Sequence, residues 1–142
     1  MNVPYAANLI CDKEDFSVMC EFLKSGLLDG ESYTLFAPKD EAFSDVGEML
    51  ETLDDDDASK VFLFHATKLT LKAKDLNCST LIVMVDGGLS RTICKDGDFI
   101  QKGGGNRKNN LLPVITETDM MACNGVVHVV SEVMLPNFID EF

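Results

Sequence analysis

The chain has 142 residues and a net charge of −12, and 46% of its residues are hydrophobic. This length suits one domain, and no apolar run approaches the roughly 20 residues that would span a bilayer. The acidic balance repels phosphate backbones and anionic lipid surfaces, so the composition argues against nucleic acid as a partner.

The first half of the chain is expected to be mainly helical. Apolar residues at helical spacing predict an amphipathic helix over residues 15–25, with Asp15 as its N-cap. A short strand at residues 33–36 is expected to run directly into a second helix. A third, buried helix is expected over residues 58–67, capped by the run of four aspartates that precedes it.

The second half of the chain is expected to form strands, because the apolar period changes to two and β-branched residues become frequent. This pattern predicts strands over residues 80–85 and 89–94, joined by a tight turn. Two further strands are expected at residues 99–101 and 111–116, on either side of a glycine-rich stretch that we interpret as a mobile hairpin loop. Helices that come first and strands that come mostly last favour an α+β fold.

The strongest strand signal lies in residues 124–136, where an Asn-Gly turn precedes a run of β-branched residues. Alternate positions of this run, Val126, His128 and Val130, would line one face, and the intervening valines would line the other. Both faces require cover, so the run predicts a central strand. A buried imidazole without a partner costs about 1 to 3 kcal/mol, so we expect a hydrogen-bond partner for His128.

The five cysteines match no zinc or CxxC spacing, and their odd number leaves at least one thiol free. Cys20 lies on the apolar face of the first predicted helix, and we interpret it as a small buried hydrophobe rather than half of a bridge. Cys78 and Cys94 flank a possible hairpin and are the better candidates for a disulfide.

No catalytic or metal-binding motif accompanies the two histidines, His65 and His128. We therefore interpret both as structural and the protein as a non-enzyme without metal or cofactor. A hydrolase that uses either histidine is an open alternative. The aspartates at residues 54–57 lack the glycine and glutamate of an EF-hand loop. Asn77-Cys78-Ser79 matches the N-glycosylation pattern, although about one such match is expected by chance.

Three stretches together resemble the fasciclin domain family. Residues 34–43 (TLFAPKDEAF) resemble its first signature box, residues 124–136 (NGVVHVVSEVMLP) resemble its second, and Phe64-His65 stands where the family has a Tyr-His pair. The resemblance implies a single domain over residues 1–142 with an α+β fold, a β-sandwich wedge with helices packed to one side. It implies structural roles for Phe36, Pro38, Asp40, Phe43, Asn124, Gly125, His128 and Pro136. The expected partner of His128 is a main-chain carbonyl or an acidic group such as Asp40.

The resemblance also implies a role in adhesion. In adhesive animal members a Glu-Pro-Asp-Ile-Met segment, assigned to integrin recognition, lies just ahead of the second box, and residues 117–121 (ETDMM) stand there in this chain. The partner-binding residues implied are Glu117, Asp119, Met120, Met121, Phe64 and His65. The implied partner is a cell-surface receptor or matrix protein, which places the domain outside the cell or on its surface, alone or within a larger protein.

Departures from the family pattern leave alternatives open. Thr118 replaces the proline and frees its φ angle, Phe64 lacks the tyrosine hydroxyl, and Asp40 replaces an asparagine. Asp119 could instead cap a turn, and the methionines that follow it could pack in the core. Residues 1–12 lack the features of a secretory signal, so the chain is either cytosolic or a mature fragment. The alternative function is a water-soluble carrier of an apolar ligand such as a carotenoid, which some algal members bind.

Overall fold

The structure is a computed structural model that describes residues 4–139, with the backbone alone at residue 109. Its helices are α1 (Ala6–Cys11), α2 (Ser17–Lys24), α3 (Asp40–Ser44), α4 (Gly47–Glu51) and α5 (Asp55–Leu63), with 3-10 turns η1 (Ala73–Asp75) and η2 (Asn109–Leu111). Its strands are β1 (Tyr33–Pro38), β2 (Ala66–Thr67), β3 (Leu81–Val83), β4 (Leu89–Lys95), β5 (Asp98–Lys102), β6 (Ile115–Ala122) and β7 (Gly125–Val130). The predicted α+β class is confirmed.

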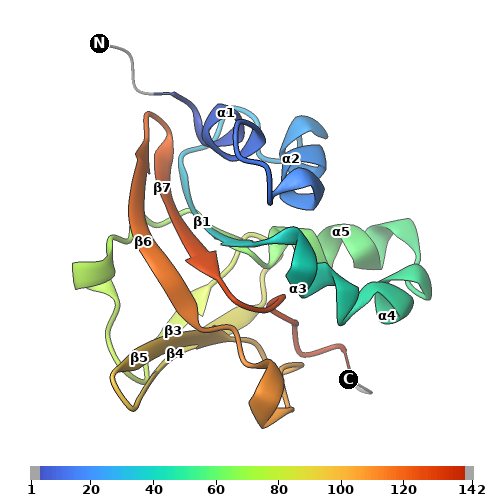
Figure 1. Ribbon diagram of the computed structural model, residues 1–142, viewed down its shortest axis with the longest axis vertical. Coiled ribbons are helices and arrows are strands. Elements are labelled where there is room, and N and C mark those ends of the chain that lie inside the picture. The colour runs from blue at the N-terminus through green and yellow to red at the C-terminus, as the bar shows by residue number, and fades with distance from the viewer. Residues whose placement is uncertain (1–3, 140–142) are drawn as a thin grey trace.

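Within the described residues, the strands form two sheets (Figure 1). The larger sheet has the order β2-β1-β7-β6, in which β1 and β7 are parallel and the other pairs are antiparallel. The smaller sheet is antiparallel and has the order β3-β4-β5. The prediction of a central strand after the Asn-Gly turn is confirmed, because β7 lies between β1 and β6.

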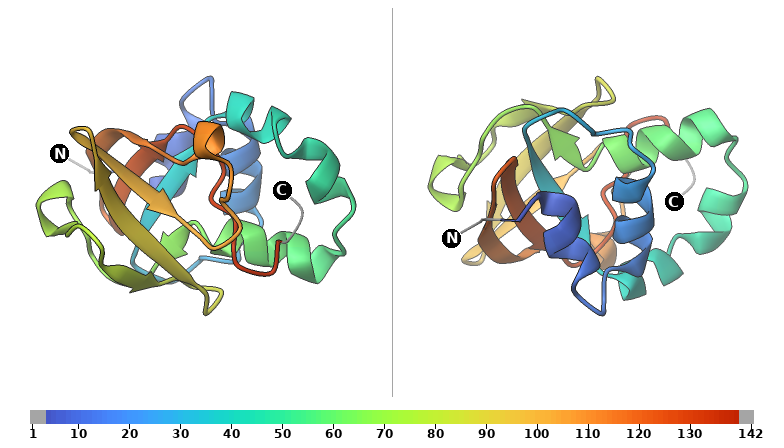
Figure 2. Two further views of the ribbon diagram at one scale, coloured as in Figure 1. Left: turned by 90° about the horizontal axis from the view of Figure 1, so that it is seen from below. Right: turned by 90° about the horizontal axis from the view of Figure 1, so that it is seen from above.

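Each face of β7 belongs to a different core. The helical core contains Met19 and Leu23 of α2 together with Leu35, Val127 and Val129 of the larger sheet. Figure 2 shows α1 and α2 lying over this face of the sheet. The other face contributes to a second core, whose buried members are Phe36, Phe64, Leu76, Ile82, Met84, Val130 and Met134. The predicted alternation of faces along β7 is therefore confirmed.

Helix α2 is capped from another part of the chain. The helix begins at Ser17, and no side chain at its N-cap position accepts a hydrogen bond. Instead, the Asp40 carboxylate at the start of α3 accepts from the backbone amides of Ser17 (3.1 Å) and Val18 (2.9 Å). The prediction that Asp15 caps this helix is wrong, because the carboxylate of Asp40, 23 residues after Ser17, occupies that place.

Helix α5 is earlier and shorter than predicted. Asp54 caps it by accepting a hydrogen bond from the amide of Asp57 at 2.8 Å, so the acidic run is a capping segment as expected. The helix ends at Leu63, and the last predicted helical residues, Ala66 and Thr67, form strand β2 beside β1. The prediction of a helix that continues to residue 67 is therefore wrong, because Ala66 and Thr67 pair with β1 as a strand.

Two expectations for the second half of the chain are also wrong. The predicted strand at residues 111–116 begins only at Ile115 and then continues to Ala122, held by pairing with β7. The glycine-rich stretch connects β5 to β6, which belong to different sheets, so it is not a hairpin loop, and its first residues are packed. Gly103 and Gly105 are buried, and a side chain on Gly103 would collide with the carbonyl oxygen of Leu135.

Two disulfides bond four of the five cysteines. The predicted Cys78–Cys94 bridge is confirmed, and Cys123 is an exposed free thiol. The interpretation of Cys20 as an unbridged hydrophobe is wrong, because it is bonded to Cys11. The sequence pattern did not reveal α1, the helix that brings Cys11 beside α2.

Candidate functional site

The acidic and apolar segment expected to bind a partner lies on β6, the outermost strand of the larger sheet. Glu117, Asp119 and Met121 are exposed, and Met120 is half-buried. The pairing of β6 with β7 shifts register on both sides of Glu117. Such bulges bend and twist a strand and re-aim its side chains. The segment therefore presents carboxylates and a methionine at an irregular sheet edge.

Asp119 holds this edge in one conformation. Its backbone has a φ of 59°, in the left-handed region that asparagine and aspartate tolerate better than most residues. Its amide donates to Nδ1 of His128 at 3.2 Å, and its carboxylate accepts from the amide of Ala73 at 2.8 Å. The side chain is exposed, so it caps η1 while remaining at the surface.

His128 is buried beneath this segment and bonds to backbone on two sides. Its Nε2 lies 2.7 Å from the carbonyl oxygen of Leu71. Because Nδ1 accepts from the Asp119 amide, the neutral ring with its proton on Nε2 satisfies both bonds. Burial lowers the pKa of His128, while the Leu71 carbonyl and the Asp119 charge act in the opposite direction. Of the two expected partners, a main-chain carbonyl is present and Asp40 is not.

His65 has the same kind of double contact in the interior. Its Nδ1 lies 2.8 Å from the carbonyl oxygen of Val61, and its Nε2 accepts from the amide of Met134 at 2.9 Å. The ring therefore ties α5 to the segment after β7. Burial lowers the pKa of His65 to about 4, although the backbone groups of Val61 and Phe62 act in the opposite direction. Phe64 and His65 are fully buried and do not reach the surface in this structure.

The remaining residues of the two boxes shape the framework around β1 and β7. Phe36 lies beside the His128 ring, with centroids 5.5 Å apart, and Phe43 stacks on Phe62 at 5.7 Å. Pro38 and Pro136 are buried. Weak burial raises the pKa of the Asp40 carboxyl, but hydrogen bonds from Ser17 and Val18 outweigh it and hold that pKa below its usual value.

The Asn124-Gly125 turn connects β7 to the starts of α1 and β1. The side-chain carbonyl of Asn124 accepts from the amide of Ala6 at 2.9 Å, and the backbone carbonyl of Asn124 accepts from the amide of Tyr33 at 2.9 Å. Gly125 has a φ of 149°, and a side chain there would collide with the Tyr33 carbonyl. Only glycine fits such a close backbone approach.

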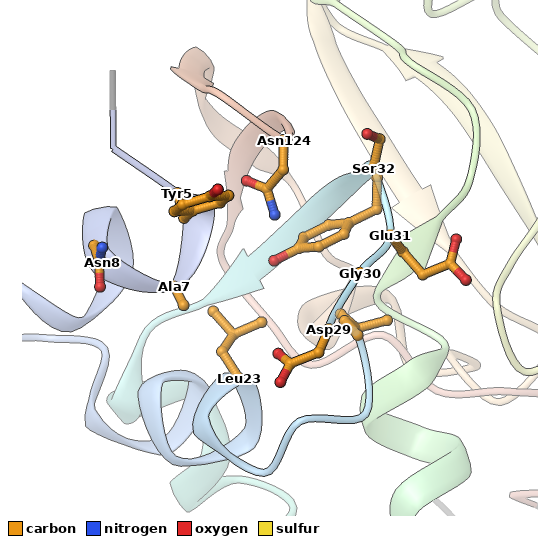
Figure 3. Close-up of a pocket in the computed structure, with 11 residues that line it drawn as sticks. Tyr5, Ala7, Asn8, Leu23, Asp29, Gly30, Glu31, Ser32 and Asn124 are labelled. Carbon is orange, nitrogen blue, oxygen red and sulfur yellow. The ribbon is translucent and has the colours of Figure 1, made fainter. Parts of the chain in front are cut away.

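A hollow of about 590 Å³ opens beside this turn (Figure 3). Carboxylates of Asp29 and Glu31 line it together with Tyr5, Tyr33 and Asn124. Burial raises the pKa of Tyr33, and the Asn124 hydrogen bond opposes that shift. Neither histidine of the chain lines this hollow, so it offers no support for a histidine-based hydrolase.

A cluster of acids on the helical side was not anticipated from the sequence. The carboxyl group of Glu132 is close to that of Asp45, and Glu41 is also near. Burial, a hydrogen bond with Asp45 and the negative charges of Asp45 and Glu41 raise the pKa of Glu132 to about 7. The cluster joins α3 to the segment after β7, so only the tertiary fold brings these residues together.

Asn77 is exposed next to the Cys78–Cys94 disulfide. In the part of the chain that the structure describes, no group of three or more His, Cys, Asp or Glu side chains is arranged to hold a metal ion. Among residues 4–139, no helix combines the length and the apolar character needed to cross a bilayer.

The fold and its contacts define a disulfide-bonded α+β domain in which both histidines support the backbone. A family model described as the fasciclin domain matches residues 14–136. The chain therefore belongs to the fasciclin domain family, as its two signature boxes indicated.

Two known proteins show how the chain is related to others. It is 30% identical over 115 residues to the transforming growth factor-beta-induced protein ig-h3 of Sus scrofa, and the match covers 78% of this chain and 16% of that protein. A solved structure of a FAS1 domain pair from the insect cell adhesion molecule Fasciclin I matches with a TM-score of 0.59 and 18% identity. That match covers 89% of this chain and 43% of the solved chain, and it shows the shared fold.

Proposed function

We propose that this domain is an extracellular or cell-surface interaction module that binds a receptor or matrix protein through β6. The contact residues are Glu117, Asp119, Met120 and Met121. The observation that carries the proposal is that this exposed segment is held in one conformation. Asp119 forms a hydrogen bond through its amide with His128 and another through its carboxylate with the Ala73 amide. Met121 is 47% exposed beside it.

A segment that is already ordered loses less conformational entropy when it binds, so His128 and η1 would raise affinity without touching the partner. The carboxylates would provide charge recognition, and Met121 would provide an adaptable apolar contact. Phe64 and His65 are omitted from this surface because both are buried. Their proposed role is to support the fold from within.

The kind of protein that the similar chains come from and the disulfides of this chain both support this role. The solved domain pair comes from an insect cell adhesion molecule. Two disulfides in 142 residues suit an oxidising compartment, since such bonds are rare in reducing cytosol. The chain spans only 16% of the length of the ig-h3 protein, which is consistent with one domain of a larger adhesive protein.

The methionine and phenylalanine content that motivated the apolar-carrier alternative has a structural explanation. The following of these residues are buried in the core: Met19, Met84, Met134, Phe16, Phe22, Phe36, Phe43 and Phe64. We therefore place the protein-interaction role ahead of the carrier role.

The free thiol next to β6 allows a direct test. Cys123 follows the strand immediately and is exposed, so maleimide-linked polyethylene glycol attached there would cover this edge. We expect cell or matrix attachment by the immobilised domain to fall strongly after labelling. As a matched control, the Cys123→Ser/Glu48→Cys variant carries the same polymer on α4 and should attach normally. Equal attachment by both labelled proteins would remove β6 from the proposal.

A further inference from the structure

An exposed apolar surface lies on the smaller sheet, away from the residues assigned above. Leu81 and Val83 of β3 are 48% and 60% exposed, while Ile82 between them is buried. Val83 pairs with Leu89 of β4, which is 50% exposed, and Leu69 is 54% exposed beside them. Isolated exposed apolar residues are ordinary, but a contiguous group on one sheet face indicates a contact surface.

This surface is hollowed. Two adjoining depressions of about 520 and 500 Å³ share Leu81 and Gly87 in their linings. The first extends from β3 over the turn after β2, and the second extends over β4 toward Gly103. We call the two depressions together the β3 groove.

The charge of the β3 groove is opposite to that of the whole chain. The chain has 24 acidic and 12 basic residues, yet the groove is lined by Lys68, Arg91 and Lys102 and by no Asp or Glu. None of these three cations forms a salt bridge with a described residue. The guanidinium of Arg91 donates to the carbonyl of Ser79 at 3.1 Å and stays exposed. An anionic ligand would therefore find its counter-charges here.

The floor of the groove is rigid. The Cys78–Cys94 bond ties β4 to the segment before β3. Beneath the sheet, Gln101 accepts from Thr92 at 2.6 Å and donates to Ser90 at 2.8 Å. These buried contacts hold the strands in register. The groove is thus formed before any ligand arrives.

We propose that the β3 groove binds an extended peptide segment of a partner protein in which large apolar residues alternate with carboxylates. Alternate side chains of an extended peptide point in opposite directions, so apolar groups can enter the two depressions while carboxylates reach the rim. The Arg91 guanidinium suits a carboxylate because it can form two parallel hydrogen bonds. The concave shape of the groove favours such a peptide over the broad surface of an anionic membrane.

The test uses a fluorescent peptide of sequence Asp-Leu-Asp-Phe-Asp-Leu-Asp, titrated with the full chain and followed by anisotropy. We expect saturable binding that weakens at least tenfold in Arg91→Gln/Lys102→Gln and in Val83→Thr/Leu81→Thr. The exposed Lys95, which lies on β4 outside both linings, provides the control variant Lys95→Gln, which should bind normally. Thermal unfolding of each variant establishes that it is folded.

Several results would overturn the proposal. The first is peptide binding that does not saturate by about 1 mM protein. The second is that a peptide with Lys in place of every Asp binds as tightly as the acidic peptide. The third is that the groove variants bind the acidic peptide as tightly as the unmodified chain. Binding to phosphatidylserine vesicles that the same variants lose would instead assign the groove to membranes. A concentration-dependent dimer lost in Val83→Thr/Leu81→Thr would assign it to a second copy. The Asp119→Asn variant should keep its peptide affinity, so failure here is distinct from failure of the β6 proposal.

Discussion

The backbone amide of Asp119 donates a hydrogen bond to Nδ1 of His128, at 3.2 Å. Through this bond, a buried residue of the second signature box sets the conformation of an exposed segment on the neighbouring strand. The other ring nitrogen is 2.7 Å from the Leu71 carbonyl, so the ring is held between two backbone groups. Hydrogen bonds through His128 therefore connect the scaffold to the proposed contact surface.

Replacing His128 should lower stability markedly. His128→Val leaves the Leu71 carbonyl and the Asp119 amide without their partner, and we expect a loss of about 2 to 4 kcal/mol in the free energy of unfolding. Urea denaturation measures it. His128→Gln, which can donate and accept, should recover part of the loss. A valine variant of unchanged or higher stability would show that the ring needs no hydrogen bonds.

The left-handed backbone of Asp119 predicts that its two simplest replacements differ. Asp119→Asn keeps a side-chain acceptor for the Ala73 amide and tolerates a φ of 59°, so stability should change little. Asp119→Ala loses both advantages and should cost about 1 to 2 kcal/mol. Chemical denaturation of the two variants side by side provides the comparison. Equal stabilities would mean that neither the cap nor the backbone strain matters.

The buried histidine His65 makes stability depend on pH. Its pKa is about 4 in the folded protein and 6.5 ordinarily, so between these values the unfolded chain binds more protons. Its contribution, of order 3 kcal/mol, is therefore complete above about pH 6.5 and is lost as the pH falls toward 4. Because Glu132 acts in the opposite direction over this range, the His65 effect is measured as a difference between two proteins. Between pH 4 and 7, the urea midpoint of the unmodified protein should rise more steeply with pH than that of His65→Gln. An unchanged slope in the variant would contradict the assignment.

The raised pKa of Glu132 predicts the opposite dependence of stability on pH. Its folded pKa is raised from 4.5 to about 7, so over this range the folded protein binds more protons and stability falls as pH rises. Glu132→Gln should therefore stabilise the protein at pH 8 by about 1 kcal/mol, allowing for solvent screening. It should have little effect at pH 4. The exposed control Glu48→Gln should change stability little at both pH values, and equal effects of the two variants at pH 8 would contradict this account.

The pairing of the cysteines predicts a simple labelling result. Iodoacetamide should modify one thiol of the unreduced protein and five after reduction and unfolding. Peptide mapping should place the single label on Cys123. A label on Cys20 in the unreduced protein would contradict the bridge between α1 and α2.

The sequence predicted those features that local patterns encode. The β-branched run after Gly125 specified a strand with two buried faces, and period-two alternation located the β3–β4 hairpin and its Cys78–Cys94 bridge. The two boxes identified the family. These signals succeed because burial on one or both faces of a strand leaves a direct imprint on neighbouring residues.

Features that depend on distant contacts were missed. Asp40 caps a helix 23 residues earlier, and Glu132 meets Asp45 across the fold. Residues 117–121 have little intrinsic strand preference, and pairing with β7 makes them part of β6. The burial of His65 likewise depends on α5 and on the segment after β7. Tertiary packing decides each of these outcomes, so they cannot be predicted from a short stretch of neighbouring residues.

The central claim is that carboxylates held on β6 contact the partner. Its most direct test is attachment by immobilised Glu117→Gln/Asp119→Asn, which removes two charges while keeping the acceptor that caps η1. The matched control is Asp98→Asn, an exposed acid on β5. We predict that attachment falls at least tenfold in the double variant and is unchanged in the control, with equal thermal stabilities. Attachment by the double variant equal to that of the unmodified domain would contradict the account.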